Sequence, residues 1–203
     1  MTPPRNDGPL ARSRPARRTI AITGADAFLG RNLIGLLEDD DRVGRILAID
    51  VKNPPTAGAK TRFYKVDLPQ PSVDARLAEI LSAESVDTFL HMAFLASPTH
   101  ASAWAHELES IGTLHVLNAC RARPVRKFVL WSQTLLYGAS PSNPNFLTED
   151  APLRGNADSR FLRDKIDVEQ AVARFAVQMP GSVVTVLRLA PILQLPVGPV
   201  GHG

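Results

Sequence analysis

Residues 23–30, TGADAFLG, form a loop that could hold a phosphate group, because they join an apolar β-branched run to a segment with helical spacing. Gly24 permits the tight strand-to-helix turn, and Gly30 lets the helix pack close to the preceding strand. The start of that helix would offer free backbone N–H groups and the positive end of its dipole to a pyrophosphate. Between these two glycines, Ala27 stands where phosphate-binding loops of this kind carry a third glycine. Its β-carbon is expected to intrude where the phosphate approaches the backbone and to weaken the affinity for the phosphate.

Asp50 is the second residue with a type and position suited to nucleotide chemistry. It ends the next apolar run, twenty residues beyond Gly30. A carboxylate there accepts hydrogen bonds from an adenosine ribose and repels the additional phosphate of NADP. The sequence therefore favours NAD over NADP as the cofactor, with Lys52 slightly blurring the discrimination. The alternative is an ordinary solvated loop acid or a helix cap.

The elements that would position these residues alternate between short apolar runs and longer helical segments. Strands are predicted over residues 18–23, 45–50, 62–67, 86–93, 127–132 and 182–189, and helices over 28–38, 74–84, 102–122 and 159–178. Strands that are apolar throughout and separated by helices indicate a parallel sheet covered on both faces. We predict an α/β fold, a doubly wound parallel sheet of the Rossmann-like, NAD(P)-binding type, with strand order 3-2-1-4-5-6.

Composition limits the class of protein. The 203 residues contain one cysteine, Cys120, which excludes an intrachain disulfide framework, and no apolar run approaches membrane-spanning length. Residues 1–18 hold five arginines against one acid, so the basic pI of about 9.3 belongs to a tail. We expect a disordered basic tail over residues 1–17 and a dinucleotide-binding domain over 18–203, in a cytoplasmic protein. A transit peptide or a nucleic-acid-binding arm is the alternative for the tail.

At this point the chain resembles the extended short-chain dehydrogenase/reductases, which include the NAD-dependent epimerases and dehydratases. Beyond residues 23–30 and Asp50, the resemblance rests on segments 90–94 (LHMAF), 111–120 (IGTLHVLNAC), 130–138 (LWSQTLLYG), 146–153 (FLTEDAPL) and 161–165 (FLRDK), and on Asp67. It implies that Asp67 contacts adenine. It also implies that further cofactor contacts come from Phe28, Leu29, Leu68, Met92, Ala93 and Lys165.

The resemblance breaks at the positions that carry the family's chemistry. The family uses a tyrosine hydroxyl as acid or base, and a lysine four residues later lowers its pKa. Here Lys165 is present but the tyrosine position is Phe161, which has no proton to exchange. The serine or threonine position that orients the substrate oxygen holds Gln133, which can still donate a hydrogen bond. Glu109 stands where relatives commonly carry an asparagine. For Phe161 the alternative is a core residue, and for Lys165 a surface lysine.

Other residues offer weaker candidates. Tyr137 lies at the carboxyl end of the fifth predicted strand and is a surrogate acid at best, and His91 is read as a structural histidine. No His, Cys or acidic cluster has metal-ligand spacing, so no metal site is predicted. Residues 138–158 form a long irregular connection, read either as a functional loop or as a surface excursion. By resemblance, the helices at 102–122 and 159–178 could pair in a homodimer.

Three function classes follow. The first is an NAD(P)-binding protein of the epimerase/dehydratase type that is atypical or lacks the usual tyrosine-dependent catalysis. This reading also rests on the expectation that the small C-terminal lobe, which forms much of the substrate pocket in relatives, is absent here. The second is an active NAD-dependent oxidoreductase or epimerase on a nucleotide sugar or another carbonyl substrate. The third, a nucleic-acid-binding module acting through the arginine-rich tail, is disfavoured because the rest of the chain is not basic.

Overall fold

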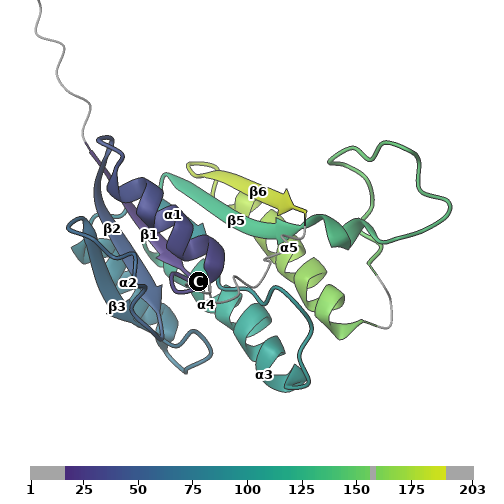
Figure 1. The fold of residues 1–203 in the computed structure, drawn as a ribbon, viewed down its shortest axis with the longest axis horizontal. Helices are drawn as coiled ribbons and strands as arrows, with labels where there is room; N and C mark the ends of the chain where they lie inside the picture. The colour runs from purple at the N-terminus through teal and green to yellow at the C-terminus, as the bar shows by residue number, and fades with distance from the viewer. Residues whose placement is uncertain (1–16, 156–158, 191–203) are drawn as a thin grey trace, which may run out of the picture.

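The computed structural model describes residues 17–155 and 159–190 (Figure 1). The expected tail thus lies outside the described residues, except for Arg17. The strands are β1 (Arg18–Thr23), β2 (Val43–Asp50), β3 (Thr61–Lys65), β4 (Thr88–His91), β5 (Lys127–Gln133) and β6 (Val183–Leu189). The helices are α1 (Phe28–Glu38), α2 (Val73–Ala83), α3 (Ser102–His106), α4 (Gly112–Ala122) and α5 (Arg160–Gln178), with a π-helical turn η1 (Glu107–Ile111) and a 3₁₀ turn η2 (Thr134–Tyr137).

The six strands form one parallel sheet in the order β3-β2-β1-β4-β5-β6. This confirms the predicted fold class and strand order. The order reverses between β1 and β4, and in open α/β sheets ligands bind in the crevice outside the carboxyl ends of the strands at such a point. The topology therefore places the end of β1, where the predicted phosphate loop begins, at the expected position.

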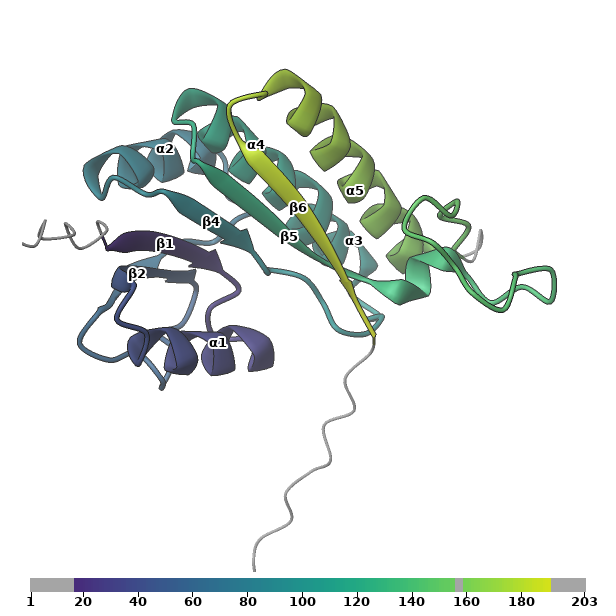
Figure 2. The same cartoon turned by 90° about the horizontal axis from the view of Figure 1, so that it is seen from above.

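Helices cover both faces of the sheet, as Figure 2 shows, with α1 on one side and α2, α4 and α5 on the other. Under α1, a small core packs Ile34 against buried residues of β1 and β2. On the opposite face a larger core contains Phe89, Phe128 and Phe175, whose rings pack in a row from β4 through β5 to α5. Burial of the continuous apolar strands on both faces agrees with their sequence pattern.

A loop rather than a helix connects β2 to β3, in agreement with the absence of a predicted helix between residues 50 and 62. The carboxylate of Glu38, the last residue of α1, accepts the backbone N–H groups of Gly58 (3.0 Å) and Lys60 (3.1 Å). The Thr56 hydroxyl donates to the carbonyl oxygen of Arg31 (2.8 Å). The Glu38 contacts satisfy backbone N–H groups of the loop, and the Thr56 contact ties the loop to α1.

The predicted helix over 102–122 has the expected bounds, but one of its turns is π-helical, which the sequence did not predict. It divides into α3, the π turn η1 and α4. A single π turn within a helix is uncommon and frequently marks a functional site. Here it contains Glu109, whose side chain is buried against α5. Apolar spacing alone does not reveal such a turn.

The long connection after η2 has no helix or strand within its described residues, 138–155. Its base is anchored by the Asn143 side chain, which donates to the Gly138 carbonyl oxygen (2.8 Å), and by Arg188, which donates to the Glu149 carbonyl oxygen (2.8 Å). The connection leads into α5, whose N-terminus is capped by the Ser159 hydroxyl accepting the Leu162 N–H. A functional role for this loop stays a prediction.

Candidate functional site

A cleft of about 270 Å³ opens at the carboxyl ends of β1, β2 and β4. It brings together seven of the predicted cofactor-binding residues, which come from four separate loops: Gly24, Ala27, Asp50, Asp67, Leu68, Met92 and Ala93. Apolar residues that the sequence analysis did not single out complete the lining, among them Phe94, Trp104 and Leu108. The sequence signals for them were the quoted segment 90–94, which ends at Phe94, and the apolar spacing of residues 104 and 108 in the predicted helix.

The two glycines of the loop are required by close backbone contacts. Gly24 has a φ of +69°, and a β-carbon there would lie 2.5 Å from the carbonyl oxygen of Met92. A β-carbon on Gly30 would overlap the carbonyl oxygen of Gly24 itself. Gly24 thus has the role in the turn that the sequence assigned to it, whereas Gly30 allows α1 to approach the loop backbone at Gly24 and Ala25 rather than the strand itself.

The N-terminus of α1 points its free backbone groups toward this loop. Ala27 is the N-cap residue and has an extended conformation, and its side chain cannot accept a hydrogen bond. The N–H groups of Phe28, Leu29 and Gly30 therefore have no acceptor within the helix. These three residues do not form the cleft lining itself, but they supply the uncapped positive end of an 11-residue helix next to Ala27.

Asp50 is the last residue of β2, and its carboxylate contacts the phosphate loop formed by residues 23–30. Its Oδ2 accepts the backbone N–H of Asp26 (2.9 Å), and its Oδ1 accepts the N–H of Val51 (2.7 Å). Each carboxylate oxygen has a second lone pair. The carboxylate is thus held in place by the backbone while it keeps acceptor capacity toward a ligand hydroxyl.

Asp26 is a lining residue that sequence reasoning missed. Its carboxylate pairs with Arg31, at 2.8 Å from a terminal guanidinium nitrogen and 2.9 Å from Nε. The pair adds a carboxylate to the phosphate loop and balances it with a cation on the first turns of α1. The signal in the sequence was a charge of each sign, five residues apart, across the start of the helix.

The predicted catalytic residues Gln133 and Lys165 lie together in a second, smaller site. Both line an enclosed space of about 10 Å³ between β5, α5 and Phe94. Oε1 of Gln133 is buried and has no hydrogen-bond partner among the described residues. The adjacent Ser132 hydroxyl is not free, because it donates to Glu169.

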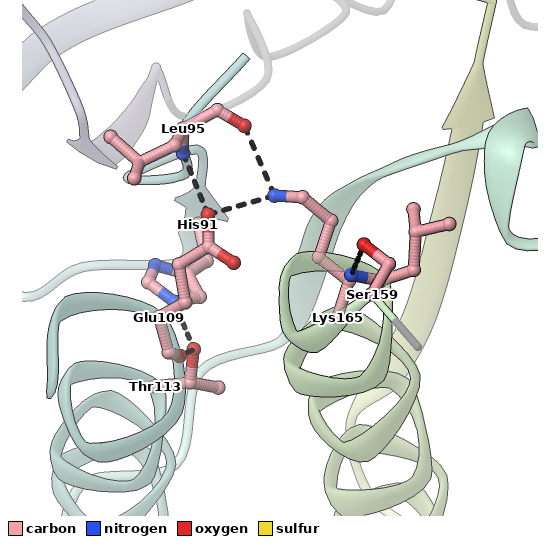
Figure 3. A network of polar contacts seen from close by, with 7 residues as sticks. His91, Leu95, Glu109, Thr113, Ser159 and Lys165 are labelled. Carbon is pink, nitrogen blue, oxygen red and sulfur yellow. Dashed lines mark hydrogen bonds and ion pairs between the residues drawn. The ribbon is translucent and has the colours of Figure 1, made fainter. Parts of the chain in front are cut away.

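Lys165 is buried and held by two protein acceptors (Figure 3). It is 4% exposed, and its Nζ lies 2.8 Å from Oε1 of Glu109 and 3.1 Å from the carbonyl oxygen of Leu95. Burial lowers the pKa of Lys165 and raises the pKa of Glu109, and the opposite charge of the partner offsets part of each shift. Lys165 does not line the larger cleft, and its contact with a cofactor stays a prediction.

Phe161 and Tyr137 occupy different surroundings. The centre of the Phe161 ring lies 4.5 Å from Nζ of Lys165, one turn earlier on α5. The Tyr137 hydroxyl accepts a hydrogen bond from Arg188 (2.7 Å), which also pairs with Glu169 (2.8 Å). Tyr137 lines neither of these two sites, so a surrogate acid role for it finds no geometric support here.

A buried hydrogen-bond chain centred on His91 connects β1 to the π turn. Nδ1 of His91 lies 2.7 Å from the Thr23 hydroxyl, and Nε2 lies 2.9 Å from the Thr113 hydroxyl. Thr113 donates to the Glu109 carbonyl oxygen, while Thr23 accepts the N–H of Met92 (3.2 Å). Because the Thr113 proton goes to Glu109, Nε2 of His91 donates to Thr113; burial keeps the imidazole neutral, so Nδ1 accepts from the Thr23 hydroxyl. Burial lowers its pKa to about 3, as befits a structural histidine.

Comparisons with known proteins agree with this geometry. The model of the NAD dependent epimerase/dehydratase family matches residues 20–193. An uncharacterized protein of Mycobacterium tuberculosis is 31% identical over 183 residues, which cover 87% of this chain and 48% of that protein. The uncharacterized UDP-glucose epimerase YtcB of Bacillus subtilis is 28% identical over 163 residues, covering 72% of this chain and 50% of YtcB.

Two solved structures show the same fold. The UDP-glucose 4-epimerase of Thermotoga maritima with UDP-glucose superposes with a TM-score of 0.70 at 22% identity, covering 84% of this chain and 54% of that one. The UDP-glucuronic acid 4-epimerase of Bacillus cereus in complex with NAD gives 0.70 at 19% identity, covering 85% and 56%. The chain spans about half the length of these relatives. Within the described residues, no helix is long and apolar enough to cross a bilayer. The sequence motifs, the strand order and the family match lead to one conclusion: the chain belongs to the NAD-dependent epimerase/dehydratase family.

Proposed function

We propose that this chain binds NAD in the cleft at the carboxyl ends of β1, β2 and β4, and that it does not use the tyrosine-dependent proton transfer of its relatives. The observation that carries the proposal is the convergence of Gly24, Ala27 and Asp50 on one cleft. The uncapped start of α1 suits the pyrophosphate, and the backbone-held carboxylate of Asp50 suits the hydroxyls of a ribose. NAD bound here would supply a hydride acceptor.

The preference for NAD over NADP rests on charge. Asp50 presents a carboxylate where NADP carries a phosphate on its adenosine ribose. Asp26 and Asp67 also line the cleft. The cation beside Asp26, Arg31, is already paired with it at 2.8 Å. Lys52 follows Asp50 by two residues and is exposed. A doubly charged phosphate would therefore meet mainly negative surroundings on this side of the cleft.

The missing proton transfer rests on Phe161 and Lys165. A phenyl ring replaces the group that would give or take the proton. The lysine that would lower the pKa of a tyrosine is held by Glu109 at 2.8 Å. A general acid or base contributes a factor of about 10² to 10⁴ to a rate. Its loss supports a role in which the chain holds the dinucleotide and any redox chemistry is slow.

Calorimetric titration of the 203-residue protein with NAD, and with NADP for comparison, tests the cofactor part of the proposal. We expect saturable heat with NAD and weaker or no heat with NADP. The absence of saturable binding of either dinucleotide would reject the proposal. Tighter binding of NADP would reject the assignment of Asp50 as the discriminating group.

A working oxidoreductase or epimerase on a nucleotide sugar is the second candidate. It is supported by Gln133, whose unpaired Oε1 shares a small buried space with Lys165, so that polar groups still meet at the family's reaction position. The two solved relatives named above are sugar-nucleotide epimerases by their descriptions. Hydride transfer between NAD(H) and an added carbonyl or nucleotide sugar, lost on Lys165→Met, would favour this candidate over a non-catalytic binder.

A further inference from the structure

Glu109 lies where the π turn η1 faces α5, and it is 1% exposed. Its Oε1 accepts two hydrogen bonds, from Nζ of Lys165 (2.8 Å) and from the backbone N–H of Leu95 (2.8 Å). Lys165 in turn donates to the carbonyl oxygen of Leu95 (3.1 Å). Glu109, Leu95 and Lys165 thus form a closed triangle of hydrogen bonds that joins η1, α5 and the loop after β4 (Figure 3).

Two aromatic rings border the ammonium in this triangle. Nζ of Lys165 is 4.5 Å from the centre of the Phe161 ring and 5.1 Å from the centre of the Phe94 ring. The faces of these rings attract a cation but carry no net charge. The only full negative charge in direct contact with Lys165, within the described part of the chain, is therefore that of Glu109.

The charge of Glu109 changes what Lys165 can do to a neighbouring group. A lone ammonium at about 4–6 Å lowers the pKa of an acid by about 1–3 pH units. A carboxylate 2.8 Å from the same ammonium produces a field of opposite sign, which opposes the effect of the ammonium at the Phe161 ring. Two other charged groups, Arg160 and Asp164 on α5, lie near this ring, and the imidazole of His106 on α3 contacts Asp164.

We propose that Glu109 is a positioning residue that fixes the ammonium of Lys165 against the loop after β4 and cancels its charge next to position 161. The position is therefore unsuited to acid–base chemistry for two reasons, the ring of Phe161 and the carboxylate of Glu109. Restoring the phenol alone leaves the second reason in place. This inference concerns the protein without cofactor and does not depend on the proposed NAD binding.

The test is the titration of a tyrosine introduced at position 161, followed by the ultraviolet absorbance of tyrosinate. The parent protein contains the same two native tyrosines, Tyr64 and Tyr137, and its titration is subtracted. With Phe161→Tyr alone we expect the new phenol to titrate at or above its ordinary pKa of about 10. With Phe161→Tyr and Glu109→Gln together, we expect that pKa to fall by about 1–3 pH units.

A triple variant that adds Lys165→Met identifies the source of the effect. The fall in the phenol pKa should disappear, because the uncompensated ammonium is its cause. If Glu109→Gln prevents folding, Glu109→Asn in the same background serves instead, with near-ultraviolet circular dichroism as the check on packing. A phenol pKa near 8 in Phe161→Tyr alone would overturn the proposal. So would equal phenol pKa values with Glu109 present and replaced, a result that a purely structural role for Glu109 would give.

Discussion

The ammonium of Lys165 faces the ring of Phe161 at 4.5 Å, in the arrangement that would place it beside a phenol in a tyrosine-bearing relative. We expect Phe161→Tyr alone to leave NAD(H)-dependent turnover of added carbonyls within about tenfold of the parent. The reasons are that Glu109 still neutralises Lys165 and that Gln133 still stands at the position where the family carries a serine or threonine. The measurement is the initial rate of NADH formation or consumption. A gain of about 10² or more, the range typical of a restored general acid or base, would contradict this expectation.

The carboxylate of Asp50 should carry a measurable share of NAD affinity. Hydrogen bonds to a charged group contribute about 1.5–3 kcal/mol, so Asp50→Ala should weaken binding by roughly 10- to 150-fold. Part of this loss would come from the loop, because Asp50 also accepts the N–H of Asp26. Asp41→Ala, at an exposed site beyond α1, is the matched control and should leave the calorimetric Kd unchanged. Equal affinity in parent and Asp50→Ala would remove this residue from the site.

Ala27 allows a prediction of the opposite sign. Its β-carbon lies at the N-cap of α1, on the cleft lining, where a glycine would leave more room for phosphate. We expect Ala27→Gly to tighten NAD binding several-fold in the same titration. Gly35→Ala is the control for a general effect of substitutions in α1 on NAD binding. A β-carbon at position 35 meets nothing within 4 Å, so this substitution should stabilise the helix without changing the Kd for NAD. Weaker NAD binding by Ala27→Gly would show that the methyl group is not an obstacle.

Much of the fold and of the larger cleft could be predicted because the signals are local. Apolar β-branched runs specify buried parallel strands, and glycines and an acid at fixed offsets mark the ends of β1 and β2. Gly24, Ala27 and Asp50 follow from those ends and from the strand order, whereas Asp67, Leu68, Met92 and Ala93 were expected from the family resemblance.

The smaller site could not be predicted in the same way because it depends on long-range pairing. Glu109 and Lys165 are 56 residues apart, and a single carboxylate at 109 gives no sign that it meets that lysine. The π turn that contains Glu109 is likewise invisible to apolar periodicity. Asp26 and Arg31 are close in sequence, but only their position beside the cleft makes the pair relevant to a ligand.

Breaking the Glu109–Lys165 pair should destabilise the protein strongly. Removing one partner of a buried pair typically costs about 3–5 kcal/mol, because the other charge remains buried. We expect such a loss for Lys165→Met in urea unfolding and a smaller loss for Lys165→Met with Glu109→Gln. Lys65→Met on the exposed side of β3 should have little effect.

The loss of stability caused by Lys165→Met alone should depend on pH, and Glu109 determines the direction of that dependence. Burial raises the pKa of Glu109 above its ordinary value of 4.5, and without Lys165 this carboxyl has lost its compensating charge. A group whose folded pKa is raised stabilises the fold at low pH, and that stability is lost as pH rises through the folded pKa. The cost of Lys165→Met should therefore be smaller near pH 5 than near pH 8. A cost independent of pH would indicate that Glu109 is not the uncompensated group.

His91 should make the folded protein less stable as pH falls, which is the opposite of the effect expected from Glu109 in the Lys165→Met variant. The fold keeps its imidazole neutral and lowers its pKa from 6.5 to about 3, whereas the unfolded chain takes up a proton below about pH 6.5. The stability due to neutral His91 is thus complete above pH 6.5 and is lost as pH falls toward 3, by about 1.4 kcal/mol per pH unit. His91→Gln should lower the unfolding free energy at neutral pH by about 1–3 kcal/mol, since Thr23 and Thr113 lose well-placed partners.

Urea unfolding of the parent and of His91→Gln between about pH 7.5 and pH 4.5 separates the loss of the His91 hydrogen bonds from the pH dependence that His91 causes. The parent should lose stability more steeply than His91→Gln as pH falls, so the two curves converge at low pH. His100→Gln, in the exposed segment before α3, is the control and should follow the parent curve. Parallel curves for the parent and His91→Gln would mean that His91 accepts a proton in the folded protein. Nδ1 of His91 would then donate to the Thr23 hydroxyl, the reverse of the direction assigned here, while Nε2 would still donate to Thr113.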